Sequence, residues 1–401
     1  MRAIALLVAR LRLLSHFAII AAAALVFGST SYAVSATPAT RSGSSAYAYV
    51  GSGSTIGSGY ISGFAVAADG FAQPVSGSPY SGASNSVVGA TNYLFATDGT
   101  NIVTYTLGSN GSLSQTSSVD GKAYDLDPQA SVVGGLTLTP NGRYLYTDEL
   151  YFDGANNVYL SWGVNSSGQL SYLPSPSLPP YSTAGGFPFA YSANGSFAYT
   201  WSICSRDGSV WGFALRPNGS LNRLNTGAQP PPPQQGQGGS DCSQAVAISS
   251  TGYAAVAWNG SFCCGGPPVI AIYSIQSNGT LSMISGSEQY ISCQNSPMAF
   301  DPSGSYLAVG CNGIQIYALS TQGRLTPIGS IQQPAVPFGT LAWDSTNHLY
   351  GIPQTGWQVC QSNGSACGLY IFNSNTGMLT LAPGSPHTLS QPGSLAVLSG
   401  R

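Results

Sequence analysis

Charge and histidine are scarce in this chain. Charged side chains make up 6% of its 401 residues, and it has only three histidines. Histidine is the commonest acid–base catalyst because its pKa lies near neutrality. The chain therefore has few residues from which a histidine-based active site could be built. The motifs GxSxG, GxGxxG and GxxxxGK[ST] are absent. Their absence removes support for an α/β-type serine hydrolase and for a nucleotide-binding protein.

Long apolar runs are missing except near the N-terminus. Basic residues there precede an apolar stretch at Phe17–Gly28, and Ser31-Tyr32-Ala33 follows as a small-x-Ala cleavage pattern. This order is typical of a Sec-type signal peptide. We therefore expect residues 1–33 to be removed near Ala33, residues 34–45 to form a flexible linker, and the mature chain to be periplasmic or secreted. No later segment approaches the ~20 apolar residues of a membrane span.

Basic charge is also lacking in the mature chain. Residues 1–33 hold three of the 11 basic residues and none of the 13 acidic ones, which leaves a net charge of −5. A nucleic-acid partner would favour a basic surface instead. Disorder is excluded as well, because 43% of the residues are hydrophobic and they alternate as in strands.

The sequence pattern of one β-hairpin recurs seven times along the chain. Each copy has an apolar strand, a polar turn that ends in glycine and a second short strand. The copies are Ile61–Val75, Ile102–Ser114, Val158–Tyr172, Val210–Leu224, Ile270–Ile284, Ile314–Ile328 and Leu369–Leu381. Their turn glycines are Gly70, Gly111, Gly168, Gly219, Gly279, Gly323 and Gly377, separated by 41, 57, 51, 60, 44 and 54 residues. A period of this size in all-β units predicts a β-propeller.

A second hairpin precedes these copies, as at Gly135–Tyr146 and Met298–Ala308. Together the two hairpins give four antiparallel strands per blade, which we name A, B, C and D from the axis outward. The sequence thus predicts an all-β, seven-bladed propeller over residues 46–401. Ala46–Val50 is a B strand without an A partner, and Ser394–Leu398 is an A strand without a B partner. We expect these two strands to pair and to close the ring.

The repeat resembles that of the lactonase-like and YVTN-repeat (WD40-like) seven-bladed propellers. The matching residues are Thr139–Tyr146 and Asp301–Ala308, followed by strands such as Ile314–Leu319. The resemblance covers residues 46–401. It implies either a sugar-lactone hydrolase of the 6-phosphogluconolactonase-like kind or a binding or surface protein. A phosphorylated lactone would call for a basic pocket, and the sequence offers none.

The loops between strands sort onto two faces, because antiparallel strands alternate in direction. The short A–B and C–D turns form what we call the short-turn face, and the long B–C and D–A loops form the variable face. All eight cysteines fall on the variable face. We expect the disulfides Cys204–Cys242, Cys293–Cys311 and Cys360–Cys367, with Cys263 and Cys264 vicinal or re-paired. Without paired CxxC spacing, neither a metal cluster nor redox catalysis is favoured.

Ten of the 13 acidic residues also map to the variable face or its approaches. Asp98, Asp148 and Glu149 end B strands, so they are the candidate ligands of a Ca²⁺ ion, which prefers oxygen donors. The alternative is that these acids are simply solvated loop residues, with no cofactor. The catalytic candidates for lactone hydrolysis are Asp148, Glu149, Arg206 and His387. His348 falls on the short-turn face, outside this set.

These observations predict an exported, monomeric propeller that binds a protein or carbohydrate ligand through its disulfide-braced variable face. The alternative is a lactonase-like hydrolase that acts on a sugar lactone or a similar small ester at the axial mouth. No nucleic-acid partner is expected.

Overall fold

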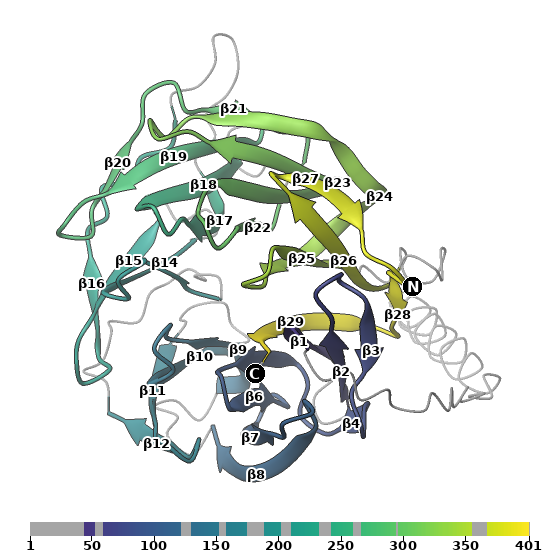
Figure 1. Ribbon diagram of the computed structural model, residues 1–401. Coiled ribbons are helices and arrows are strands. Elements are labelled where there is room, and N and C mark those ends of the chain that lie inside the picture. The colour runs from purple at the N-terminus through teal and green to yellow at the C-terminus, as the bar shows by residue number, and fades with distance from the viewer. Residues whose placement is uncertain are drawn as a thin grey trace, which may run out of the picture. The chain divides into compact units, whose positions relative to one another are not determined.

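The computed structural model describes residues 44–52, 59–121, 130–151, 158–174, 188–201, 210–231, 242–259, 266–293, 296–354 and 367–400. The chain divides into two units, residues 1–38 and 39–401, and every described residue belongs to the second. The described residues form β-strands and no helix (Figure 1). The predicted all-β class is confirmed, whereas the predicted signal peptide lies outside the described residues.

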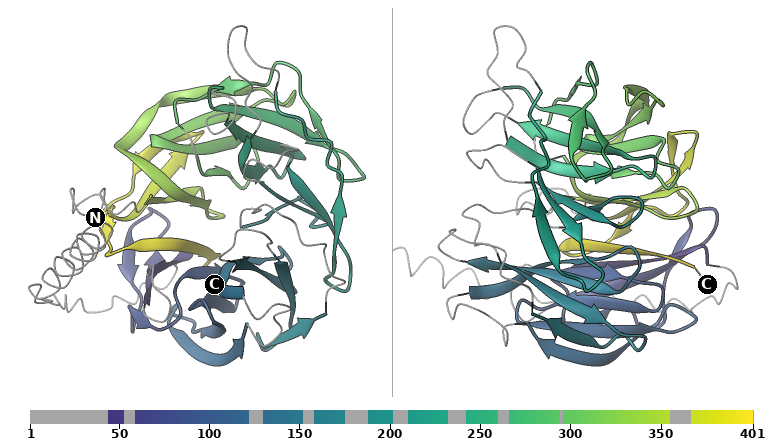
Figure 2. Two further views of the ribbon diagram at one scale, coloured as in Figure 1. Left: turned by 180° about the vertical axis from the view of Figure 1, so that it is seen from behind. Right: turned by 90° about the vertical axis from the view of Figure 1, so that its left-hand side faces the viewer.

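Five sheets have the predicted blade form of four antiparallel strands, and they follow one another in chain order (Figures 1 and 2). The first is β29 (Pro392–Ser399), β1 (Ala46–Ser52), β2 (Tyr60–Val66) and β3 (Ala72–Pro74), with β4 (Tyr80–Ser81) paired to β2. The second is β5 (Ser86–Gly89), β6 (Tyr93–Thr97), β7 (Asn101–Leu107) and β8 (Leu113–Asp120). The third is β9 (Ala130–Leu138), β10 (Tyr144–Tyr151), β11 (Val158–Val164) and β12 (Leu170–Leu173).

The next two sheets repeat this plan. The fourth is β13 (Ala190–Tyr191), β14 (Phe197–Thr200), β15 (Trp211–Leu215) and β16 (Leu221–Leu224). The fifth is β17 (Cys242–Ile248), β18 (Tyr253–Asn259), β19 (Val269–Ile275) and β20 (Leu281–Met283), with β21 (Gln289–Tyr290) paired to β19.

The sixth sheet is larger than a blade and spans the last two copies of the repeat. It is β22 (Met298–Phe300), β23 (Tyr306–Leu319), β24 (Leu325–Trp343), β25 (His348–Pro353), β26 (Gly368–Asn375) and β27 (Met378–Leu381), with β28 (His387–Thr388) paired to β26. The prediction of seven separate blades is therefore wrong: five sheets are single blades and the sixth is not.

The two long strands of this sheet explain the difference. The element β23 contains both the predicted B strand and the predicted C strand of this copy, and the Leu319 amide at its end donates to the Ser305 carbonyl just before its start at 2.7 Å. The element β24 contains the D strand of one copy and the A strand of the next, so it pairs first with β23 and then with β25. Short connections thus merge what the sequence divides into two blades.

The C-terminal strand pairs with the first described strand, as the sequence predicts. β29 runs antiparallel to β1, from Ala46 opposite Ser399 to Ser52 opposite Pro392. Every residue of β1 is buried. The two ends of the described chain therefore complete one sheet.

The apolar core lies between consecutive sheets. Ala48 and Val50 of the first sheet pack with Tyr350 and Ile371 of the last one, and similar clusters fill the spaces between the other neighbours. Burial on both faces favours the apolar, aromatic and β-branched residues found in the inner strands.

A repeated hydrogen bond, which we call the turn joint, also links consecutive sheets. A side chain at the first or second position of a B strand reaches the carbonyl oxygen that lies two residues before the turn glycine of the next copy. The tyrosine joints are Tyr47–Ser109 (3.1 Å), Tyr93–Ser166 (2.5 Å), Tyr144–Pro217 and Tyr253–Thr321 (2.8 Å). In the last copy His348 takes the tyrosine's place, and its Nε2 lies 3.3 Å from the Ala68 oxygen. The tyrosines of the repeat thus serve packing between sheets.

Candidate functional site

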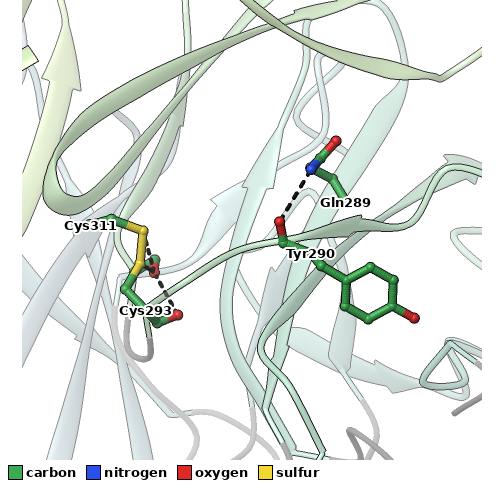
Figure 3. Close-up of a disulfide and its surroundings, with 5 residues drawn as sticks. Gln289, Tyr290, Cys293 and Cys311 are labelled. Carbon is green, nitrogen blue, oxygen red and sulfur yellow. Dashed lines mark hydrogen bonds between the residues drawn. A yellow bond between two sulfur atoms is a disulfide. The ribbon is translucent and has the colours of Figure 1, made fainter. Parts of the chain in front are cut away.

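The Cys293–Cys311 disulfide lies where the chain enters the sixth sheet (Figure 3). Cys293 follows β21 and Cys311 lies within β23, with their Cα atoms 5.5 Å apart. The Ser296 hydroxyl is 2.8 Å from the Cys293 sulfur. This bond confirms one predicted pair, and it fastens a D–A connection to the end of a B strand on the variable face.

Two further cysteines, Cys242 at the start of β17 and Cys367 just before β26, are also disulfide-bonded. Each of their predicted pairs includes a cysteine outside the described residues, so both pairings stay predictions. The cysteines outside the described residues are Cys204, Cys263, Cys264 and Cys360.

Asp98 occupies the short turn between β6 and β7. Its Oδ1 accepts hydrogen bonds from the amides of Thr100 at 2.9 Å and Asn101 at 2.7 Å, and its Oδ2 accepts one from Asn101 Nδ2 at 3.1 Å. Burial would raise the pKa of Asp98, but these hydrogen bonds lower it. Its carboxylate therefore holds a turn together, which is sufficient to account for its position.

Asp148 and Glu149 lie on β10, where their backbones pair with Tyr159 and Val158. Their side chains lie outside what the structure describes, as does the whole of Arg206. Within the described ranges, no group of three or more His, Cys, Asp or Glu side chains could hold a metal ion. The Ca²⁺ site and the catalytic roles of these residues stay predictions.

His387 lies on β28, opposite Leu369 of β26. Its ring packs against that of Phe64, with 5.1 Å between the centroids. Burial lowers the pKa of His387, so the neutral imidazole is favoured in the folded state. The structure thus places this candidate in packing between the last sheet and the first, whereas the side chains of the other three catalytic candidates lie outside what it describes.

A cavity of about 470 Å³ opens on the variable face of the fourth sheet. It is lined by Val210, Trp211, Arg223, Leu224, Asn225, Thr226 and Gln229. The Arg223 guanidinium lies over the Trp211 ring, 5.0 Å from its centroid. The attraction between its positive charge and the face of the aromatic ring stabilises this arrangement. The cavity thus combines a cation, amides and apolar walls within the size range of small-ligand pockets.

The rim of this cavity is held by hydrogen bonds. The Thr226 hydroxyl donates to the Val210 carbonyl at 2.7 Å, and the Tyr273 hydroxyl from the next sheet donates to the Gln229 carbonyl at 2.5 Å. Arg223 was missed by the sequence argument. The signal was available, because Arg223 pairs with Phe213 in its hairpin and so lies diagonally across from Trp211.

A short Gly-Ser motif was also missed. It follows the D strand in three copies, at Gly77-Ser78, Gly286-Ser287 and Gly384-Ser385, just before β4, β21 and β28. Each glycine has a positive φ. Each serine hydroxyl accepts the hydrogen bond of a C-strand amide, from Gly63, Ile272 and Ile371. Tyr80, Gln289 and His387 stand at the same place after this motif, so His387 occupies a position that the repeat uses structurally.

No family model matches this chain. No curated protein matches it either. Among solved structures, it is similar to a candidate 6-phosphogluconolactonase from Bacteroides uniformis, with 15% identity, a TM-score of 0.63, and coverage of 88% of this chain and 100% of that one. It is also similar to the periplasmic gluconolactonase of Pseudomonas aeruginosa, with 14% identity, a TM-score of 0.59, and coverage of 89% and 99%.

A Lactobacillus plantarum protein shows 12% identity, a TM-score of 0.61, and coverage of 88% and 99%. At these identities the likeness establishes the propeller fold alone. Separately, none of the described residues belongs to a helix long and apolar enough to cross a membrane.

Proposed function

We propose that this protein is an exported, monomeric binding module whose ring is closed by β29 and whose variable face takes a carbohydrate ligand. The observation that carries the proposal is the cavity between Val210 and Gln229, where Arg223 lies over Trp211 on a rim fixed by hydrogen bonds. A guanidinium forms strong paired hydrogen bonds with carboxylates. We infer that the ligand is a sugar that carries a carboxylate.

Two further features support a binding role. The Cys293–Cys311 disulfide restrains a connection on the same face, and rigid loop bases favour binding because less conformational entropy is lost. Of the candidate site residues with described side chains, the candidate metal ligand Asp98 binds its own turn and the catalytic candidate His387 packs against Phe64.

The binding test uses the full mature chain on immobilised oligosaccharides, half of them neutral and half containing uronic acids. We expect binding to the acidic set, weakened about tenfold or more by Arg223→Gln, which corresponds to about 1.4 kcal/mol. Arg216→Gln is the matched control, because Arg216 lies in a C–D turn on the short-turn face. Equal binding by wild type and Arg223→Gln contradicts the proposal. A chain that binds a protein but neither set of oligosaccharides would be a protein-binding module instead.

The second candidate is a lactonase-like hydrolase. It is favoured by the named activities of the two gluconolactonase-type proteins with similar folds. The same purified chain is assayed on aldonolactones with and without Ca²⁺ or Mg²⁺. Turnover that Asp148→Ala abolishes would establish the hydrolase and displace the binding module as the principal function.

A further inference from the structure

The joint between the last and first copies of the repeat differs in chemistry from the tyrosine joints. His348 is 2% exposed, and its Nδ1 lies 2.7 Å from Asp344 Oδ2. Its Nε2 faces the Ala68 carbonyl of the turn between β2 and β3, in the first sheet. Both partners can only accept hydrogen bonds, since one is a carboxylate and the other a carbonyl. A histidine satisfies both only when both ring nitrogens carry protons.

Asp344 is held in place independently of the imidazole. Its Oδ1 accepts from the amides of Thr346 at 2.8 Å and His348 at 2.9 Å, and its Oδ2 accepts from the Tyr350 hydroxyl at 2.8 Å. Asp344 is 4% exposed. The carboxylate therefore stays beside Nδ1, where the Thr346 hydroxyl also lies at 3.0 Å. A neutral imidazole has one N–H, so it donates to Asp344 or to Ala68 and loses the hydrogen bond to the other.

We propose that His348 is a proton-dependent clasp between the last sheet and the first, held as the imidazolium at mildly acidic pH and loosened when it loses a proton. The clasp lies beside the apolar cluster that joins Tyr350 and Ile371 to Ala48 and Val50. Leu395 and Val397 of β29 pack against the same cluster, so the clasp and the β29–β1 pairing share this part of the core.

The titratable groups that face His348 support this direction of the pH dependence, in which the clasp is held at the lower pH. Asp344 and Tyr350 come from the sixth sheet, as His348 does, and Asp69 comes from the turn between β2 and β3. The uncharged Asn373 of β26 pairs with His348. Burial would lower the pKa of His348, but the hydrogen bond and charge of Asp344 raise it, helped by Ala68 and Asp69. Burial would raise the pKa of Asp344, but His348 and Tyr350 lower it.

The pH window follows from these directions. A raised histidine pKa contributes stability below its ordinary value of 6.5, which is lost as pH rises through the folded-state pKa. A lowered aspartate pKa contributes stability above 3.8, which is lost as pH falls through the folded-state pKa. The clasp is therefore fully held between these two ordinary values.

The test compares melting temperatures of the full mature chain at about pH 5.5 and about pH 8. His348→Tyr restores the side chain that the other joints use, so it retains the joint and removes the titration. We expect wild type to lose about 2 °C or more at the higher pH relative to His348→Tyr. An equal change in both proteins overturns the proposal.

His387→Gln is the control for sign. Burial lowers the pKa of His387, so its contribution to stability is lost as pH falls, opposite to that of His348. This variant should therefore show a larger loss than wild type on going to the higher pH. A smaller loss overturns the assignment of the wild-type change to His348.

Hydrogen exchange on the wild-type chain provides a measurement that needs no variant. After correction for intrinsic rates, we expect residues 66–72 to lose protection at about pH 8 while residues 107–113, which belong to the Tyr47 joint, keep theirs. An equal change in both segments overturns the proposal.

Discussion

Glycines in the short turns between strands meet two separate demands, as Gly219 in a C–D turn and Gly252 in an A–B turn show. Gly219 has a φ of +83°, which favours glycine, and a Cβ atom there would lie 2.5 Å from Cδ1 of Tyr144 in the preceding sheet. Gly252 has a φ of +90°, but a Cβ atom there would meet nothing within 4 Å. A comparison of Gly219 with Gly252 therefore separates the need for a positive φ from the need for space beside the Cα atom.

We therefore expect Gly252→Ala to lower the free energy of unfolding by about 1–2 kcal/mol through backbone strain alone. Gly219→Ala should lower it by a further 1–3 kcal/mol or so, because the ring of Tyr144 must move. Chemical denaturation of both variants measures the difference. Equal losses would show that the contact with Tyr144 is easily relieved.

At the scale of elements, the Cys293–Cys311 disulfide closes a loop with a sequence separation of 18 residues. A loop of this length stabilises the folded chain by about 3 kcal/mol, mainly through the unfolded state. We expect Cys311→Ser to lower the free energy of unfolding by about that amount under non-reducing conditions, and Cys293→Ser/Cys311→Ser to lower it no further. A double variant that loses twice as much would indicate that the cysteines act separately.

The sequence predicts the single blades well, because strand alternation and turn glycines are local signals. It fails at β23 and β24, because nothing local states that Cys311–Gly313 and the residues after Ile328 remain within continuous strands. The joint of His348 with Ala68 spans 280 residues, so only the fold brings the two together. Copy-by-copy alignment would have placed His348 among the joint tyrosines.

The site was less predictable than the fold. Trp211 is 3% exposed, as expected of a core tryptophan, yet its ring faces Arg223 at the wall of a cavity. Cysteine pairing followed from loop positions, and the Cys293–Cys311 pair is confirmed. The acids gave no such signal, since Asp98 is explained by a turn that its sequence, Asp-Gly-Thr-Asn, already favours.

At the scale of the whole molecule, β29 is the only hydrogen-bonded neighbour of β1 on its A-strand side among the described residues. Removal of Pro392–Arg401 would expose one edge of β1, which is buried along its length, together with the contacts of Ala396 and Leu398. We expect this truncation to remove most of the ~5–15 kcal/mol that typically stabilises a domain. The truncated chain should be unfolded or aggregated by circular dichroism.

Complementation distinguishes loss of this strand from a general effect of shortening the chain. A synthetic peptide of residues 391–401 should restore the melting transition when added to the truncated chain, because β1 offers a free edge for an added strand. The same peptide with Ala396 and Leu398 replaced by Asp should fail, since both side chains are buried, each 6% exposed. Removal of Arg401 alone, which is not part of β29, should leave the transition unchanged. A chain without Pro392–Arg401 that melts within about 2 °C of the full chain would show that the remaining sheets hold the fold without the pairing of its ends.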